Sequence, residues 1–241
     1  MLTKCQIIVF HTIKHSDNGV VVKGFSNKSG KSTYYFYVGK KHSNNNLIAP
    51  LNIIDAVVYN RHSSQTAIGM PVIKELNNAY KLQSIRGDIR KTSIALYISE
   101  LLQKSIKEIE PNSELYNFLV KSILLLDSLE NGIENFHLYF TVQYCKQLGY
   151  MPINNYSEER QYFNFETAMF CNNFNDLMCL DIEQSKLLNR MLSLQLYNLN
   201  QIKCSGRFRG EFLKRLLDYI SFHIGSKIDL KSICVLGEIF N

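Results

Sequence analysis

The spacing of apolar residues changes near Tyr80, and this change divides the chain into two parts of different structure. Before it, short runs rich in Val, Ile, Phe and Tyr alternate with turn residues, which is typical of β-strands. After it, apolar residues recur three and four positions apart, which is typical of amphipathic helices. The 241 residues therefore predict an α+β protein with a β-domain at residues 1–80 and an all-helical domain at residues 81–241.

The β-domain is predicted to contain five short strands. They lie at residues 4–12, 19–26, 31–38, 51–59 and 67–76. The segment 27–30 between the second and third strands is typical of a hairpin turn, in which Gly30 takes a positive φ. Five short strands without a strong amphipathic helix favour a small β-barrel of the OB type. A sandwich with the same number of strands is the alternative.

The helical domain is predicted to contain helices that start near Ile94, Leu115 and Ile133. Two more are predicted at residues 182–199 and 207–224. Gly149 and Gly225 are placed to end two of these helices, because glycine readily adopts the left-handed conformation of a helix C-terminus. Residues 154–174 are polar and aromatic without clear periodicity, so we expect an irregular excursion there.

The net positive charge of the chain belongs entirely to the β-domain. The chain carries a net charge of +6; residues 1–80 contain nine basic and three acidic residues, and residues 81–241 contain 18 of each. A basic β-domain beside a neutral helical domain suggests a module that binds a polyanion. The chain has no apolar run that could span a bilayer and no signal-peptide core, so we expect a cytoplasmic protein without membrane contact.

Lys40, Lys41 and His42 form the strongest local basic segment. They follow the aromatic residues 34–37, and cations beside aromatic rings suit single-stranded nucleic acid, since cations contact phosphates while rings stack on bases. A solvated loop beside packed tyrosines is the alternative. The other predicted DNA-binding residues are Lys23, Lys31, Arg61, Arg86, Arg90 and Lys91. For the last three, ion pairing with Asp88 and neighbouring acids is an equal alternative.

Motifs of enzymes and metal sites are missing from the sequence. Gly30-Lys31-Ser32 resembles the end of a P-loop, but Phe25 stands where that motif needs glycine, and a strand follows instead of a helix. The histidines belong to no metalloprotease, hydrolase or paired-carboxylate motif. The six cysteines include no C-x-x-C pair. We therefore expect no catalytic residues, no metal and no cofactor.

Three stretches of the helical domain resemble the bacterial recombination mediator family RecO in order and spacing. They are SIRGDIRKTSIALYISELL at residues 84–102, the stretch from Phe140 to Leu148-Gly149-Tyr150-Met151-Pro152, and FLKRLLDYI at 212–220 followed by IDLKS at 228–232. Length and the β-then-α plan also match, so the resemblance covers nearly the whole chain.

The resemblance implies an N-terminal OB-fold, a helical C-terminal domain and no active site. It also implies binding of single- and double-stranded DNA, annealing of complementary strands, and RecR as a partner. A further implied partner is the C-terminal tail of single-stranded DNA-binding protein (SSB), through which the family helps RecA load onto coated strands. Some members carry a four-cysteine zinc site where this chain has only Cys171 and Cys179, so no zinc finger is expected. An enzyme acting on nucleic acid and an RNA-binding adaptor are the alternatives.

The SSB tail offers carboxylates and a terminal aromatic ring, so its site is expected to pair a cation with an apolar groove. Phe140 and Tyr144 are four residues apart on one predicted helix and are the predicted lining of that groove; ordinary core residues are the alternative. Many members have Arg where Tyr139 stands here. The cation is therefore predicted to come from Lys214 or Arg215.

Overall fold

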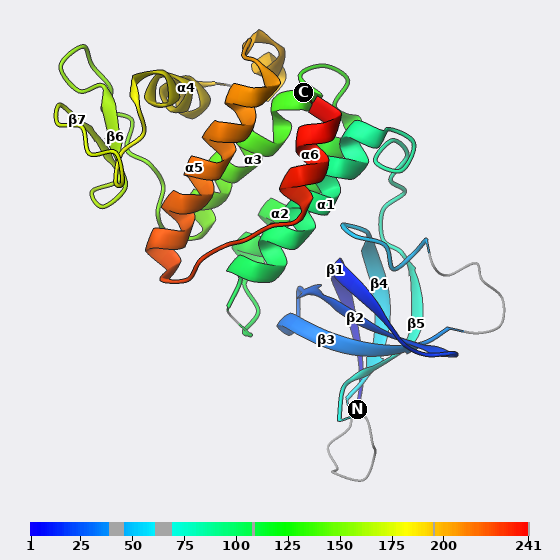
Figure 1. Cartoon of the computed structure of the whole chain (residues 1–241). Helices are drawn as coiled ribbons and strands as arrows, with labels where there is room; N and C mark the ends of the chain where they lie inside the picture. Colours follow the sequence, from blue (N-terminus) through cyan, green and yellow to red (C-terminus); the bar gives the residue numbers. More distant parts are fainter. Residues whose placement is uncertain (39–45, 61–68, 108, 195, 241) are drawn as a thin grey trace. The chain divides into compact units, whose positions relative to one another are not determined.

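The computed structural model describes residues 1–38, 46–60, 69–107, 109–194 and 196–240 (Figure 1). The strands are β1 (Leu2–Ser16), β2 (Gly19–Ser26), β3 (Gly30–Tyr37), β4 (Ile53–Tyr59), β5 (Val72–Asn78), β6 (Tyr162–Asn164) and β7 (Met169–Cys171). The helices are α1 (Ile89–Ser105), α2 (Ser113–Ser128), α3 (Ile133–Gln147), α4 (Ile182–Ser193), α5 (Gly206–Ile224) and α6 (Ser232–Phe240), with a 3₁₀ helix at Leu196–Gln201.

The chain forms two compact units, Met1–Ser128 and Leu129–Asn241. The first unit contains β1 to β5 with α1 and α2, and the second contains the remaining helices with β6 and β7. The predicted domain boundary after residue 80 falls between β5 and α1, inside the first unit. Within the described residues, no helix is both long and apolar enough to cross a membrane.

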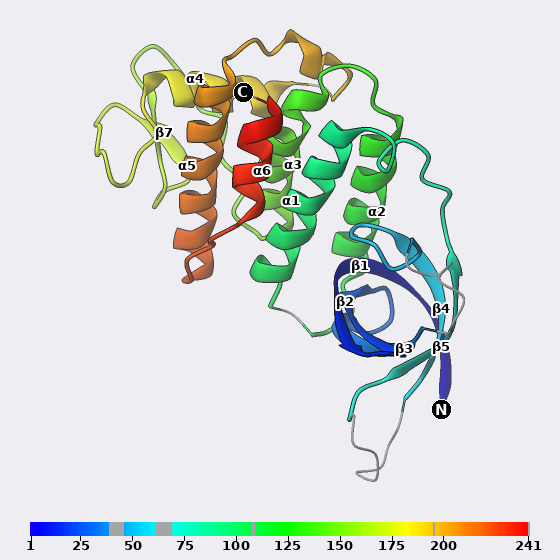
Figure 2. The same cartoon turned by 45° about the vertical axis from the view of Figure 1, so that its right-hand side comes forward.

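Strands β1 to β5 close into a barrel in the order β1-β2-β3-β5-β4, with β4 pairing back onto β1. All neighbours are antiparallel except β3 and β5, which run parallel. Figure 2 shows the strands curling around the barrel axis. The predicted fold class, an OB-like barrel followed by helices, is confirmed.

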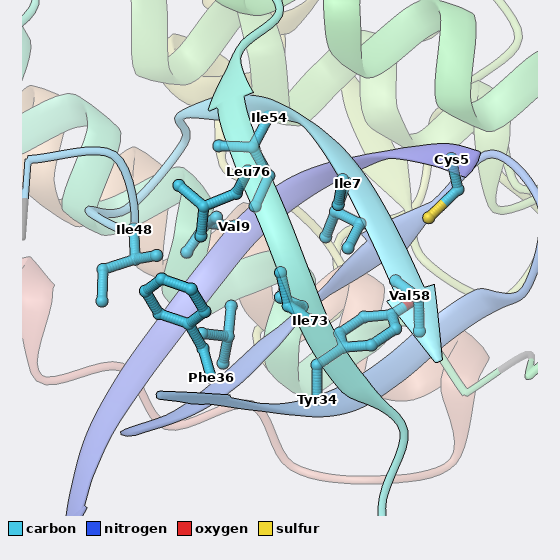
Figure 3. Packing of buried hydrophobic residues seen from close by; sticks show 12 residues of the cluster. Cys5, Ile7, Val9, Tyr34, Phe36, Ile48, Ile54, Val58, Ile73 and Leu76 are labelled. Carbon is cyan, nitrogen blue, oxygen red and sulfur yellow. The ribbon is translucent and has the colours of Figure 1, made fainter. Parts of the chain in front are cut away.

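The barrel is filled by alternate residues of its strands, because successive side chains of a strand point to opposite faces. Cys5, Ile7 and Val9 of β1 point inward and meet Tyr34 and Phe36 of β3, as Figure 3 shows. All five are at most 9% exposed. Burying aliphatic and aromatic side chains stabilises each by about 1.5–3 kcal/mol, so the inward-pointing side chains of β1 and β3 stabilise the barrel.

Gly30 ends the hairpin turn between β2 and β3 and has a φ of +60°, as the sequence predicts. A Cβ at this position would also collide with the backbone carbonyl oxygens of Ile109 and Glu110. Any other residue here would combine a left-handed backbone with a steric conflict. The turn therefore requires glycine for two separate reasons.

Helices α1 and α2 are each joined to the barrel by a side-chain hydrogen bond to β1. Ser99 of α1 donates its Oγ to the Phe10 carbonyl of β1. The hydroxyl of Tyr116 on α2 donates to Oε1 of Gln6, 3.1 Å away. Phe10 and Ser99 are both buried, so α1 covers part of the outer face of β1.

The second unit departs from the sequence prediction in three places. Residues 154–174, predicted to be irregular, contain the hairpin of β6 and β7. The predicted helix 182–199 ends at Ser193, and a 3₁₀ helix follows. Helix α6 has no counterpart in the prediction; it packs against α5, which in turn packs against α3. Nine residues with few polar positions carry too little periodicity to distinguish a short helix from a strand.

Candidate nucleic-acid interface

The outer face of β1, β2 and β3 carries a lysine and aromatic rings in adjacent rows. His11 of β1 lies opposite Lys23 of β2, which lies opposite Thr33 of β3. The next row contains Ile13, Val21 and Tyr35. These residues alternate with the inward-pointing ones, so they share the outer face. We call the two rows, together with His15 and Tyr37, the strand face.

Aromatic rings of the strand face contact one another. Tyr35 lies 5.7 Å from His15 and 4.8 Å from Tyr37, centroid to centroid, in edge-on arrangements. Tyr35 is buried with Val21 and Val72 in a small apolar cluster, whereas Tyr37 is 54% exposed. The packed ring of Tyr35 therefore supports an exposed ring that nucleobases can reach.

The predicted DNA-binding residues of the barrel have different surroundings. Lys23 lies on the strand face. Lys31 instead donates its Nζ to the carbonyl oxygens of Gln103, 2.6 Å away, and Ile106, so its charge lies at the negative C-terminal end of α1. Lys40, Lys41, His42 and Arg61 lie outside the described residues, and their contribution to binding stays a prediction.

The three predicted cations at the start of α1 are held by protein groups. Arg90 forms an ion pair of 2.6 Å with Asp88, and this partner holds the pKa of the Asp88 carboxyl below its ordinary value. Lys91 is only 4% exposed, and its Nζ donates to Ser84 Oγ and to the Asp127 carbonyl, each 2.7 Å away. Arg86 donates to Oδ1 of Asn52 at 2.8 Å.

Asp127 at the end of α2 fixes the segment that leads from the barrel into α1. Its carboxylate accepts hydrogen bonds from the backbone N–H groups of Gln83, Ser84 and Ile85 at 2.8 to 2.9 Å. Burial alone would raise the pKa of Asp127, but these donors hold it below its ordinary value. The three donors lie 42 to 44 residues away in the sequence, so no local pattern indicates this role.

The four residues predicted to dock the SSB tail do not form one surface. Phe140 and Tyr144 stack at 5.8 Å on α3 and are 2% and 0% exposed, so neither ring lines an open groove in this structure. Arg215 donates to the carbonyl oxygens of Asp176, Leu177 and Cys179 and lies 4.8 Å above the ring of Phe165. Its guanidinium therefore holds the segment before α4.

Lys214 lines a cavity of about 470 Å³ between α5 and α6. The apolar part of its wall includes Leu213, Ile233, Leu236 and Phe240. Arg209 also lines the cavity. It is 7% exposed and donates to Oδ1 of Asn135 and to the carbonyl oxygens of Cys204 and Phe240. Arg207 at the rim pairs with Glu211 at 2.9 Å. The cavity combines an apolar wall with a basic rim.

Cys171, the last residue of β7, and Cys179 lie close together. Both thiols donate to the carbonyl oxygen of Asn173, at 3.1 and 3.8 Å, and burial together with the neighbouring Cys179 raises the pKa of Cys171. Over the ranges that the structure describes, no three His, Cys, Asp or Glu residues gather as a metal site. The predicted absence of zinc stays a prediction.

Comparison with known proteins gives one consistent result. The family model described as "Recombination protein O C terminal" matches residues 86–232. Proteins named "DNA repair protein RecO" are similar over 100% of both chains: 30% identity over 248 residues in Flavobacterium johnsoniae, 29% over 246 in Flavobacterium psychrophilum, and 24% over 245 in Azobacteroides pseudotrichonymphae. The similarity therefore includes the barrel, which precedes the part that the family model covers.

Proposed function

Because this chain belongs to the Recombination protein O family, we propose that it acts in DNA repair as a recombination mediator in the cytoplasm. It binds single- and double-stranded DNA and anneals complementary strands. With RecR, it helps load RecA onto single strands coated by SSB. The observation that carries this proposal is the strand face, which lies on the barrel to which the whole net charge of the chain belongs.

The strand face has the chemistry that single strands require. Lys23 supplies a cation, and the exposed ring of Tyr37 supplies a flat apolar surface for a base. Lys40, Lys41 and Arg61 add positive charge to the same β-domain in the sequence, and His42 follows Lys41 directly. Contacts of this kind are made to phosphates and base faces, so they favour binding without sequence preference.

Annealing by this protein needs no catalytic residue. Two complementary strands repel each other through their phosphates, and a basic surface lowers that repulsion while it holds the strands together. The reaction then proceeds by base pairing, which the DNA supplies. We therefore propose a non-enzymatic protein without a cofactor, whose activity falls as salt concentration rises.

An annealing assay on SSB-coated complementary strands tests this function. The full chain should accelerate duplex formation at low salt, and the acceleration should decline steeply with added salt. Addition of RecR should then speed RecA assembly on the coated strand. No acceleration over coated strands alone at any salt concentration would contradict the proposal.

We further propose that the SSB tail docks in the cavity between α5 and α6. The apolar wall suits the terminal aromatic ring of the tail, and the basic rim suits its carboxylates. Lys214 is exposed at this rim, so of the two predicted cations it is the one that reaches a ligand in the cavity.

Lys214→Ala and Arg215→Ala should therefore behave differently although the two residues are adjacent. Lys214→Ala should weaken binding of a fluorescent SSB-tail peptide about fivefold to tenfold, because the tail then has one charge-assisted hydrogen bond fewer, and should leave thermal stability unchanged. Arg215→Ala should lower the melting temperature, because three carbonyl oxygens lose their donor, with no loss of affinity in the folded protein. Lys203→Ala, which removes an exposed charge outside the cavity, is the control. Equal peptide affinity of Lys214→Ala and wild type would move the cation elsewhere.

A further inference from the structure

A second cavity lies in the first unit, where β5 leads towards α1. Its volume is about 360 Å³, within the range of about 300 to 1,000 Å³ that is usual for small-ligand pockets. Residues that line it include Asn52, Asn78, Tyr80, Lys81, Leu82 and Arg86. The lining that the structure describes contains two cations and no acidic residue, so the cavity favours an anionic ligand.

Arg86 is fixed at this cavity before any ligand arrives. Its Nη2 donates to Oδ1 of Asn52 at 2.8 Å. Asn52 is buried, and its Nδ2 donates to the carbonyl oxygens of Asn46 and Leu47 at 2.6 and 3.0 Å, which fixes the amide with its oxygen towards Arg86. A guanidinium has five N–H donors, so Arg86 keeps donors for a phosphate. Partial desolvation lowers the pKa of Arg86, while the residue as a whole is exposed, so its remaining donors are accessible to a ligand.

The backbone that carries Arg86 is also fixed. Asp127 accepts hydrogen bonds from the three residues that precede Arg86 in the chain, and the buried ammonium of Lys91 holds Ser84 at 2.7 Å. After Arg86, the N–H groups of Gly87 and Asp88 donate to the Ser84 carbonyl at 3.1 and 3.0 Å. Because this turn is ordered by the protein itself, binding a ligand here requires little further ordering.

The remaining lining supplies groups that a base can use. Tyr80 is 36% exposed and lies next in the chain to Lys81, so a ring and a second cation share the cavity. Asn78 is exposed at the end of β5, and its amide offers a donor and an acceptor to a base edge. A simple anion would need only the cations, whereas a nucleotide uses the cations, the ring and the amide.

We propose that this cavity holds one nucleotide of a single strand, with its phosphate on Arg86 and Lys81, its base stacked on Tyr80 and its base edge at Asn78. The inference rests on the proposed DNA binding and extends it from the strand face to the turn before α1. The predicted basic segment from Lys40 to His42 ends four residues before Asn46 of this cavity in the sequence. A single strand of DNA that occupies the cavity and also contacts that segment would therefore touch residues that are close together in the sequence.

The test measures binding of the full chain to a fluorescent oligo-dT and to an oligomer of equal length that consists of abasic sites. Tyr80→Ala should weaken binding of oligo-dT about 5- to 100-fold, the usual effect of losing one stacked base, and should leave binding of the abasic oligomer unchanged. Tyr80→Phe should retain wild-type affinity for both. Phe222→Ala, which removes an aromatic ring that is 46% exposed on α5, is the control and should change neither affinity.

A crosslinking experiment on the wild-type chain avoids reliance on the fold of a variant. An oligomer with 5-iodouracil, irradiated in complex with the protein, should crosslink to Tyr80, as mass spectrometry of the peptides would show. Crosslinks confined to the strand face, or wild-type affinity of Tyr80→Ala for oligo-dT, would overturn the cavity proposal while DNA binding itself stands. Equal losses on both oligomers would overturn the stacking role of Tyr80. A wild-type chain that binds no single strand would overturn both proposals.

Discussion

Asp127→Ala is expected to lower the free energy of unfolding by about 3 kcal/mol. The substitution removes the acceptor of three backbone N–H groups, those of Gln83, Ser84 and Ile85. The hydrogen bond from Gln83 is exposed and the other two are partly buried, so water replaces part of the lost acceptor and each donor costs about 1 kcal/mol, the low end of the usual range. Urea unfolding of the full chain measures the change. Asp17→Ala is the matched control, because the Asp17 side chain is 98% exposed and should change stability by less than about 0.5 kcal/mol.

The contribution of Asp127 should also depend on pH. Its pKa is lower in the folded protein than in the unfolded chain, so its contribution to stability is complete above the ordinary carboxyl pKa of about 4 and is lost as pH falls through the lower, folded value. The stability difference between wild type and Asp127→Ala should therefore be constant near neutral pH and shrink below about pH 4. A difference under about 0.5 kcal/mol at pH 7, or one that grows as pH falls, would contradict the role of Asp127.

Phe140→Ala is expected to lower the free energy of unfolding by about 3–5 kcal/mol, which is usual for removing a buried aromatic ring. The ring is 2% exposed and stacks on Tyr144, so its removal leaves a cavity in the second unit. Phe140→Leu should cost less, because it retains most of the apolar volume. Denaturant unfolding measures both variants, with Phe222→Ala as an exposed aromatic control.

The same variants separate a core residue from a binding residue. If Phe140 is core, Phe140→Leu retains wild-type affinity for the SSB-tail peptide at a temperature where it is folded. A stable Phe140→Ala that fails to bind the peptide would instead assign Phe140 to the docking site, as the sequence predicts.

Phe140 and Tyr144 show what helical spacing can and cannot reveal. Their separation of four residues correctly indicates that both side chains lie on one face of α3. Whether that face meets protein or solvent depends on elements more distant in the sequence. Core and groove residues obey the same periodicity, so the sequence alone could not decide between them.

Local features were predictable from the sequence for a related reason. The strand at residues 4–12 and the turn at Gly30 depend on residues close together in the chain, and the structure confirms both predictions. The partners of Lys31 lie 72 and 75 residues away, and Lys91 reaches the Asp127 carbonyl across 36 residues. The charge of a residue thus follows from the sequence, whereas its availability to a ligand depends on long-range packing.

Our main proposal is that the barrel binds single strands of DNA. The salt dependence of binding to oligo-dT is the sharpest test of this proposal. The wild-type chain should show a linear fall of log K with log salt concentration. The double variant Lys40→Ala/Lys41→Ala should bind more weakly, with a slope reduced by about 0.7 for each phosphate that the two lysines neutralise in the wild type. Lys203→Ala/Lys227→Ala removes the same charge from exposed positions of the second unit and should leave the slope unchanged. An unchanged slope for the barrel variant, together with a reduced slope for this control, would place DNA binding on the helical unit and contradict the account.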